Sequence, residues 1–107
     1  MTVLDWRNLP TARVAPLYEA EEARWRRDLS WDARSTWRIV EDARRAGELP
    51  GYALVGASGA VEGWTFFLVH GDTLQIGALT AREARGVRRL LDEVMQAPEA
   101  SLAQRVS

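Results

Sequence analysis

The sequence predicts an α+β fold, with a mainly antiparallel sheet of about four strands and three main helices in the order β-α-α-β-β-β-α. Residues 61–69, VEGWTFFLV, carry large apolar side chains on both faces of a strand pattern, which is typical of a central strand covered on both sides. Residues 84–95 repeat apolar side chains with the spacing of one buried helical face. We therefore expect the first two helices and the last helix to cover opposite faces of the sheet.

Length and composition indicate one ordinary globular domain. The 107 residues are 47% hydrophobic and 27% charged, a balance that argues against disorder. The formal net charge of −1 provides no overall field for nucleic acid or for an anionic membrane, so neither is expected as a partner. All 14 basic residues are Arg, which we attribute to the codon usage of a high-GC, bacterial genome.

Missing residue types exclude several kinds of chemistry. No cysteine is present, which excludes disulfides, thiolate nucleophiles and cysteine-ligated metal centres. The single histidine, His70, has no second histidine with which to form a metal pair, so no metal site is expected. The N-terminus lacks the pattern of a signal peptide, and no apolar run reaches the ~20 residues of a membrane span. We therefore expect a cytoplasmic protein with no membrane partner.

The first part of the chain predicts one short strand and two helices. A strand fits residues 2–6, and Thr11 can cap the helix that follows. Asp32 is a suitable N-cap for a second helix that ends near Ala46, with Gly47 at the C′ position. The apolar face of the first helix comprises Val14, Leu17, Tyr18 and Trp25.

Three strand patterns joined by short turns come next. Residues 52–55 are the first, residues 61–69 the second and residues 73–79 the third. Residues 57–60 and 70–72 contain the glycines that suit hairpin turns, so the three strands are expected to be antiparallel neighbours.

The last helix follows the third strand directly. Thr80 and Glu83 form a capping-box pattern, so we place the helix start at Thr80 and its end at Gln96. Residues 105–107 have the pattern of the first residues of another strand. Trp6 and Trp31 stand near element ends, where we expect them to cover the sheet edge or to line a cleft. The side chains expected to be mostly buried are Trp64, Phe66, Leu68, Leu74, Ile76, Leu90, Leu91 and Val94.

The passage from the third strand into the last helix is where we expect a ligand site. The start of a helix attracts anions because its first backbone N–H groups are unpaired and the helix dipole is positive there. The alternative is a plain strand–helix packing unit. The arginines around this turn either hold phosphates or form a solvated helix face with Asp92 and Glu93. They are Arg82, Arg85, Arg88 and Arg89.

The order of elements resembles the N-terminal half of the GNAT superfamily of N-acetyltransferases. Two stretches carry the resemblance, residues 13–32 (RVAPLYEAEEARWRRDLSWD) and residues 49–79 (LPGYALVGASGAVEGWTFFLVHGDTLQIGAL). The resemblance covers essentially the whole chain but about half of the family's fold. It implies a GNAT-like partial fold in a single domain, residues 1–107, which is the N-terminal half of a complete fold or of a longer chain.

The resemblance implies acetyl-CoA as cofactor and a primary amine as acetyl acceptor. In the family, the pantetheine arm pairs with the strand that Leu74–Leu79 matches, and a Q/R-x-x-G-x-G/A turn surrounds the pyrophosphate. Arg82 matches the first motif position, whereas Arg85 and Val87 stand where small residues are expected. Glu83 would occupy the same N–H groups as a phosphate, so we expect this chain to bind acetyl-CoA weakly or not at all. The implied cofactor-binding residues are Ile76, Ala78, Leu79, Arg82, Arg85, Gly86 and Val87.

Polar residues of the predicted sheet complete the set of candidates. Glu62 is the carboxylate that the resemblance offers as general base, although a solvated side chain beside a hairpin is the ordinary alternative. Gln75 either hydrogen-bonds a ligand amide or faces solvent. Tyr18 and Tyr52 fit core or edge positions, and the general acid of the family has no counterpart that we can identify.

Two other functions are compatible with the sequence. One is a non-catalytic GNAT-like structural or interaction domain, and the other is an unrelated small α+β ligand-binding domain. In either case the exposed edge of strand 74–79 is expected to pair with a C-terminal half-domain or with a second copy of the chain.

Overall fold

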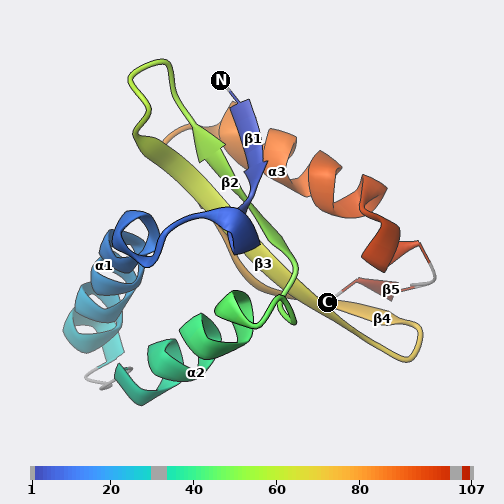
Figure 1. Cartoon of the computed structure of the whole chain (residues 1–107), viewed down its shortest axis with the longest axis horizontal. Helices are drawn as coiled ribbons and strands as arrows, with labels where there is room; N and C mark the ends of the chain where they lie inside the picture. The colour runs from blue at the N-terminus through green and yellow to red at the C-terminus, as the bar shows by residue number, and fades with distance from the viewer. Residues whose placement is uncertain (1, 30–33, 102–104, 107) are drawn as a thin grey trace.

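The computed structural model describes residues 2–29, 34–101 and 105–106 (Figure 1). Two short 3-10 turns, η1 at Trp6–Asn8 and η2 at Pro98–Ala100, accompany the main elements. The helices are α1 Thr11–Leu29, α2 Arg34–Arg45 and α3 Ala84–Gln96. The strands are β1 Thr2–Asp5, β2 Gly51–Val55, β3 Val61–His70, β4 Thr73–Ala81 and β5 Arg105–Val106.

The strands form one sheet in the order β1-β2-β3-β4-β5. The first four are antiparallel neighbours, as predicted, and the two hairpins turn where the glycines predicted them. The pattern at residues 105–107 does begin a strand: β5 runs parallel to β4, with Thr73 opposite Arg105 and Leu74 opposite Val106. The α+β prediction with three helices and four antiparallel strands is therefore confirmed, and a short parallel strand is added to it.

The sheet is the middle layer of three. Helices α1 and α2 lie on one face and α3 lies on the other (Figure 1). Trp64 and Phe66 of β3 pack in one buried cluster with Val14 and Tyr18 of α1, whereas Phe67 packs in the other with Val94 of α3. The two-sided strand thus has the cover on both faces that its sequence predicted. None of the helices within the described ranges is long and apolar enough to cross a membrane.

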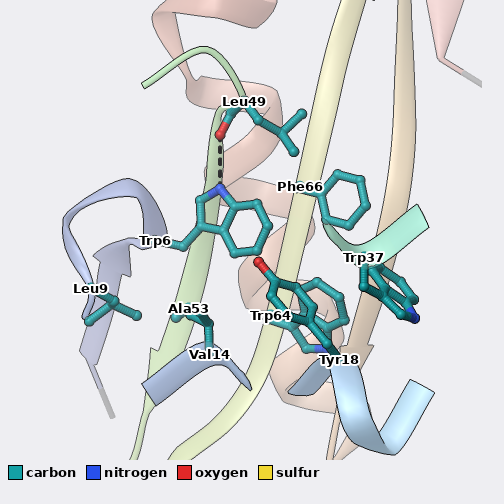
Figure 2. Packing of buried hydrophobic residues seen from close by; sticks show 9 residues of the cluster. All are labelled: Trp6, Leu9, Val14, Tyr18, Trp37, Leu49, Ala53, Trp64 and Phe66. Atoms are coloured by element: carbon teal, nitrogen blue, oxygen red, sulfur yellow. Dashed lines mark hydrogen bonds between the residues drawn. The ribbon is translucent and has the colours of Figure 1, made fainter. Parts of the chain in front are cut away.

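Trp6 lies within the larger core, whereas we expected it to cover the sheet edge or to line a cleft. It is 0% exposed, its Nε1–H donates to the carbonyl of Leu49 at 2.9 Å, and its ring stacks on Phe66 with centroids 5.3 Å apart (Figure 2). Gly51 leaves the room that the Trp6 ring occupies, because a Cβ at this position would lie 2.6 Å from the indole nitrogen. Trp31, which we grouped with Trp6, and the proposed N-cap Asp32 lie outside the described residues.

Arg44 and Glu41 of α2 form a buried ion pair whose further hydrogen bonds join α2 to the N-terminal segment. Arg44, whose side chain is 1% exposed, contacts Glu41 through Nε at 2.7 Å and Nη2 at 2.8 Å. Its Nη1 donates to the carbonyls of Trp6 and Leu9 at 2.8 and 2.6 Å. Thr11, which we expected as an N-cap, is the first residue of α1, and its hydroxyl donates to Glu41 instead at 2.6 Å.

Several details of the C-terminal part differ from prediction. Thr80 does not start the last helix, because β4 continues its pairing with β3 as far as Ala81, and α3 begins at Ala84. Leu68 is 39% exposed because it lies on β3 beyond Phe66, past the buried cluster under α1 and α2. Ile76 and Leu91 are only partly buried. The other predicted core residues, Trp64, Phe66, Leu74, Leu90 and Val94, are buried.

Candidate functional site

The outer edge of β4 is the first feature of the candidate site. β5 pairs with Thr73 and Leu74 only, so among the described residues the edge from Gln75 to Ala81 has no partner strand. An unpaired edge presents backbone N–H and C=O groups that can accept another extended chain. This edge ends two residues before α3, so it leads directly to a helix N-terminus.

The side chains of the three strand residues implied by the resemblance are engaged in packing. Ile76 packs against the cluster on the α3 side, and Ala78 against the cluster on the α1 and α2 side. Leu79 lies opposite Thr65 of β3 and is partly buried. These residues can therefore contact a ligand through the backbone N–H and C=O groups at the open edge of β4.

A bulge at Gly77 explains why Ile76 and Ala78 serve opposite faces. The register between β3 and β4 shifts between Phe66 and Phe67, which leaves Gly77 without a paired residue. A side chain at Gly77 would overlap the ring of Phe66. Bulges bend a strand locally and redirect its neighbours, so the open edge changes direction in its middle.

A hollow of about 180 Å³ lies where β4 passes into α3. Two carboxylates, Glu62 and Glu83, and two arginines bring charge to its wall, and the arginines are Arg82 and Arg85. Leu54 and Gly86 form part of the rest. Gly86 is buried, and a Cβ there would lie 3.0 Å from Leu54 Cδ2 and from Ala81 Cβ. The small residue in this turn therefore lets the start of α3 pack closely on the sheet.

The N-terminus of α3 is not capped as predicted. Glu83 is the N-cap residue, but its side chain makes no capping hydrogen bond. Its carboxylate instead contacts Arg85 Nε at 2.7 Å, and both side chains are exposed. The expectation that Glu83 occupies the N–H groups needed by a phosphate is thus wrong.

The arginines of this region divide into two groups. Arg89 pairs with Glu93 at 3.4 Å across one helical turn, as expected of a solvated helix face. Arg82 and Arg85 line the hollow, and Arg88 is exposed on α3. Val87, the remaining motif position, is partly buried. The cationic groups available to a ligand in the hollow are therefore the first two arginines of the turn.

A second hollow, of about 290 Å³, lies on the other face of the sheet between α1 and the β3–β4 pair. Leu17, Ala20 and Glu21 of α1 form one wall, and Trp64 and Thr80 belong to the strands opposite. The sequence pattern did not predict that α1 and Thr80 lie close together, since they are distant along the chain.

Glu62 lies between the two hollows and lines both, as do Ala81 and Arg82. The register between β2 and β3 shifts beside it, because Leu54 pairs with Gly63 but Val55 pairs with Val61. Glu62 is the bulge residue without a partner on β2, whereas its carbonyl accepts from the backbone N–H of Arg82 at 3.0 Å. Its side chain is 31% exposed, and Arg82 Nη1 lies 3.9 Å from its Oε1.

The remaining polar candidates do not join the site. Gln75 and His70 are exposed, and His70 ends β3 beside the Gly71 turn as predicted. Tyr18 belongs to the core and donates to Glu41 Oε1 at 2.8 Å, whereas Tyr52 is half-buried near Phe67. No cluster of three or more potential metal ligands occurs among the residues that the structure describes.

No protein-family model, no curated protein and no solved structure matches this chain. The function of the chain is therefore inferred from two features of the molecule itself, the open edge of β4 and the two hollows that meet at Glu62.

Proposed function

We propose that this chain forms the cofactor-binding corner of a GNAT-type N-acetyltransferase, which transfers an acetyl group from acetyl-CoA to a primary amine. The single observation that carries the proposal is the open edge of β4 from Gln75 to Ala81, which leads into the hollow at the start of α3. An extended ligand with amide groups in its middle and phosphates at one end suits such a corner.

The residues of the corner fit such a ligand in three ways. Backbone groups of β4 are open to the amides of a pantetheine arm. Arg82 and Arg85 supply positive charge for phosphates at the hollow. The side chain of Glu83 makes no capping hydrogen bond, and the N–H of Gly86 donates to the Glu83 carbonyl, so the N–H groups of Ala84 and Arg85 are the ones that a phosphate oxygen can accept from.

Acetyl-CoA, when bound, supplies an acetyl group activated as a thioester. The contribution of this chain to the transfer is a proton acceptor, because an amine attacks a thioester only when it is neutral. Glu62 lines both hollows and is partly exposed, so we assign it the role of general base, acting directly or through one water.

A second candidate function has its own support. Arg85 contacts Glu83 at 2.7 Å, and Arg82 lies 3.9 Å from Glu62, so each arginine of the hollow already has a carboxylate beside it. Arg85 and Val87 also replace small residues of the family turn. A GNAT-like domain that binds no cofactor and serves as a structural or interaction module would tolerate both features.

Isothermal titration of the 107-residue chain with CoA separates the two functions. We expect weak but saturable binding that weakens as salt is added, since exposed arginines meet the phosphates. Arg82→Ala and Arg85→Ala should each weaken it severalfold, whereas Arg45→Ala, an exposed arginine of α2, should have no effect. Absence of binding at millimolar CoA and low salt would refute cofactor binding and favour the non-catalytic module. Equal affinity for all three variants would show that CoA does not bind at this corner.

A further inference from the structure

The second hollow is lined by apolar side chains and by a few charged ones, a composition that suits some amines better than others. Resting on the proposed function, we propose that this hollow binds the acceptor, and that the acceptor is a small monoamine with an apolar substituent. This class of acceptor excludes polycations, such as polyamines and aminoglycosides, and it excludes free amino acids.

The apolar body of the acceptor is inferred from the walls of the hollow. Leu17 packs against the larger core cluster and faces the hollow from α1, beside Ala20. Val61 and Trp64 face it from β3. The volume of about 290 Å³ lies near the lower end of the range for small-molecule sites, roughly 300–1,000 Å³, so the substituent must be compact.

The single positive charge of the acceptor is inferred from the carboxylate of Glu62. Within the described part of the chain, no hydrogen bond reaches its carboxylate, and its nearest cation, Arg82 Nη1, lies 3.9 Å away. The Arg82 side chain is 77% exposed, so leaving this contact costs little. An ammonium group can therefore take the free acceptor positions of Glu62 while apolar atoms contact Leu17.

The other charges of the hollow limit the acceptor to one cationic group. Glu21 lines the hollow too, but it is largely buried and its Oε2 is already 2.5 Å from Arg24 Nη2. Glu21, Glu62 and Arg82 are the charged side chains that line the hollow, two carboxylates and one guanidinium, so their net charge of −1 is balanced by one ammonium group. A zwitterionic amino acid brings no net charge to balance the hollow and places its carboxylate near Glu62 and Glu21, which disfavours free amino acids.

Ligand titrations at pH 7 test this class, because aliphatic amines are protonated there. Three probes share a phenyl group: phenethylamine, 3-phenylpropanoate and phenylalanine. Ethanolamine carries the charge without the apolar body, and spermidine adds charges. Binding is followed by NMR chemical shifts and by tryptophan fluorescence, since Trp64 lines the hollow. We expect phenethylamine to bind at least tenfold more tightly than any of the other four.

Two pairs of variants locate the binding. Glu62→Gln should weaken phenethylamine at least tenfold, whereas Glu19→Gln, an exposed carboxylate of α1, should not change it. Ala20→Phe fills the hollow from an exposed helix position and should abolish binding, whereas Ala23→Phe, also exposed on α1, should not. Circular dichroism checks that all four variants remain folded.

Three results would overturn the proposal: no binding of phenethylamine, equal or tighter binding of phenylalanine or spermidine, or unchanged binding in folded Ala20→Phe. The titration with CoA is independent of these measurements. Amine binding without CoA binding would refute the proposed cofactor corner and leave the amine site standing. If CoA binds but the amine fails to bind both with and without CoA present, only the proposed acceptor class is refuted.

Discussion

Replacing Arg44 by Met tests whether the buried ion pair organises the N-terminal part of the fold. Met retains most of the length of the side chain and removes its charge and donors. Arg44 makes two contacts to Glu41 and one each to the carbonyls of Trp6 and Leu9. The guanidinium carbon also lies 5.8 Å from the centre of the Trp6 ring. All of these interactions are lost in Arg44→Met.

The expected loss of stability follows from the burial of the pair. Removing one partner of a buried salt bridge costs about 3–5 kcal/mol, because the remaining charge is left uncompensated. Glu41 keeps hydrogen bonds from Thr11 and Tyr18, which places the cost of Arg44→Met near 3 kcal/mol, the lower end of that range. A domain of ordinary stability, about 5–15 kcal/mol, would still fold but would be clearly weakened.

Urea unfolding followed by tryptophan fluorescence measures this cost. Arg45→Met is the matched control, because Arg45 is the next residue of α2 and is exposed, and it should change the free energy of unfolding by less than ~0.5 kcal/mol. In a double-mutant cycle with Glu41→Gln, we expect a coupling of about 1–3 kcal/mol. A loss below ~1 kcal/mol in Arg44→Met, or no coupling to Glu41, would show that the pair does not hold α2 in place.

Two further predictions concern the core and acid stability. Leu90→Ala should lower the free energy of unfolding in urea by about 2–5 kcal/mol, because Leu90 is fully buried. Leu91→Ala should lower it clearly less, because Leu91 is only partly buried. Equal losses would contradict the packing of the Leu90 face of α3 against the sheet. Burial opposes ionisation of Glu41, but hydrogen bonds from Arg44, Thr11 and Tyr18 outweigh it and lower the pKa to about 2 from 4.5. The resulting stabilisation is complete above pH 4.5 and is lost as the pH falls through 2, so urea melts between these values should show declining stability, with a shallower decline in Glu41→Gln.

Local sequence patterns determined the elements of this fold. The hairpin at Gly71 and the end of α2 at Gly47 were predictable because both positions have positive φ, which glycine adopts without strain. Strand β3 was predictable as a central strand because its apolar residues alternate onto two faces, and both faces need cover. The prediction of a ligand site between β4 and α3 followed from element order alone, since a strand that feeds a helix places its end at the helix N-terminus, and a hollow does lie there.

Contacts between distant residues decided the rest. Thr80 and Glu83 match a capping box, but pairing of β4 with β3 as far as Ala81 takes Thr80 into the sheet. No sequence signal distinguishes Arg44 from the exposed Arg45 beside it, and only its hydrogen bonds to the carbonyls of Trp6 and Leu9 make it a core residue. The two hollows depend on how α1 and α3 pack on opposite faces of the sheet beside Glu62. No pattern in the sequence specifies such placements, because they are set by the packing of whole elements and not by the preferences of neighbouring residues.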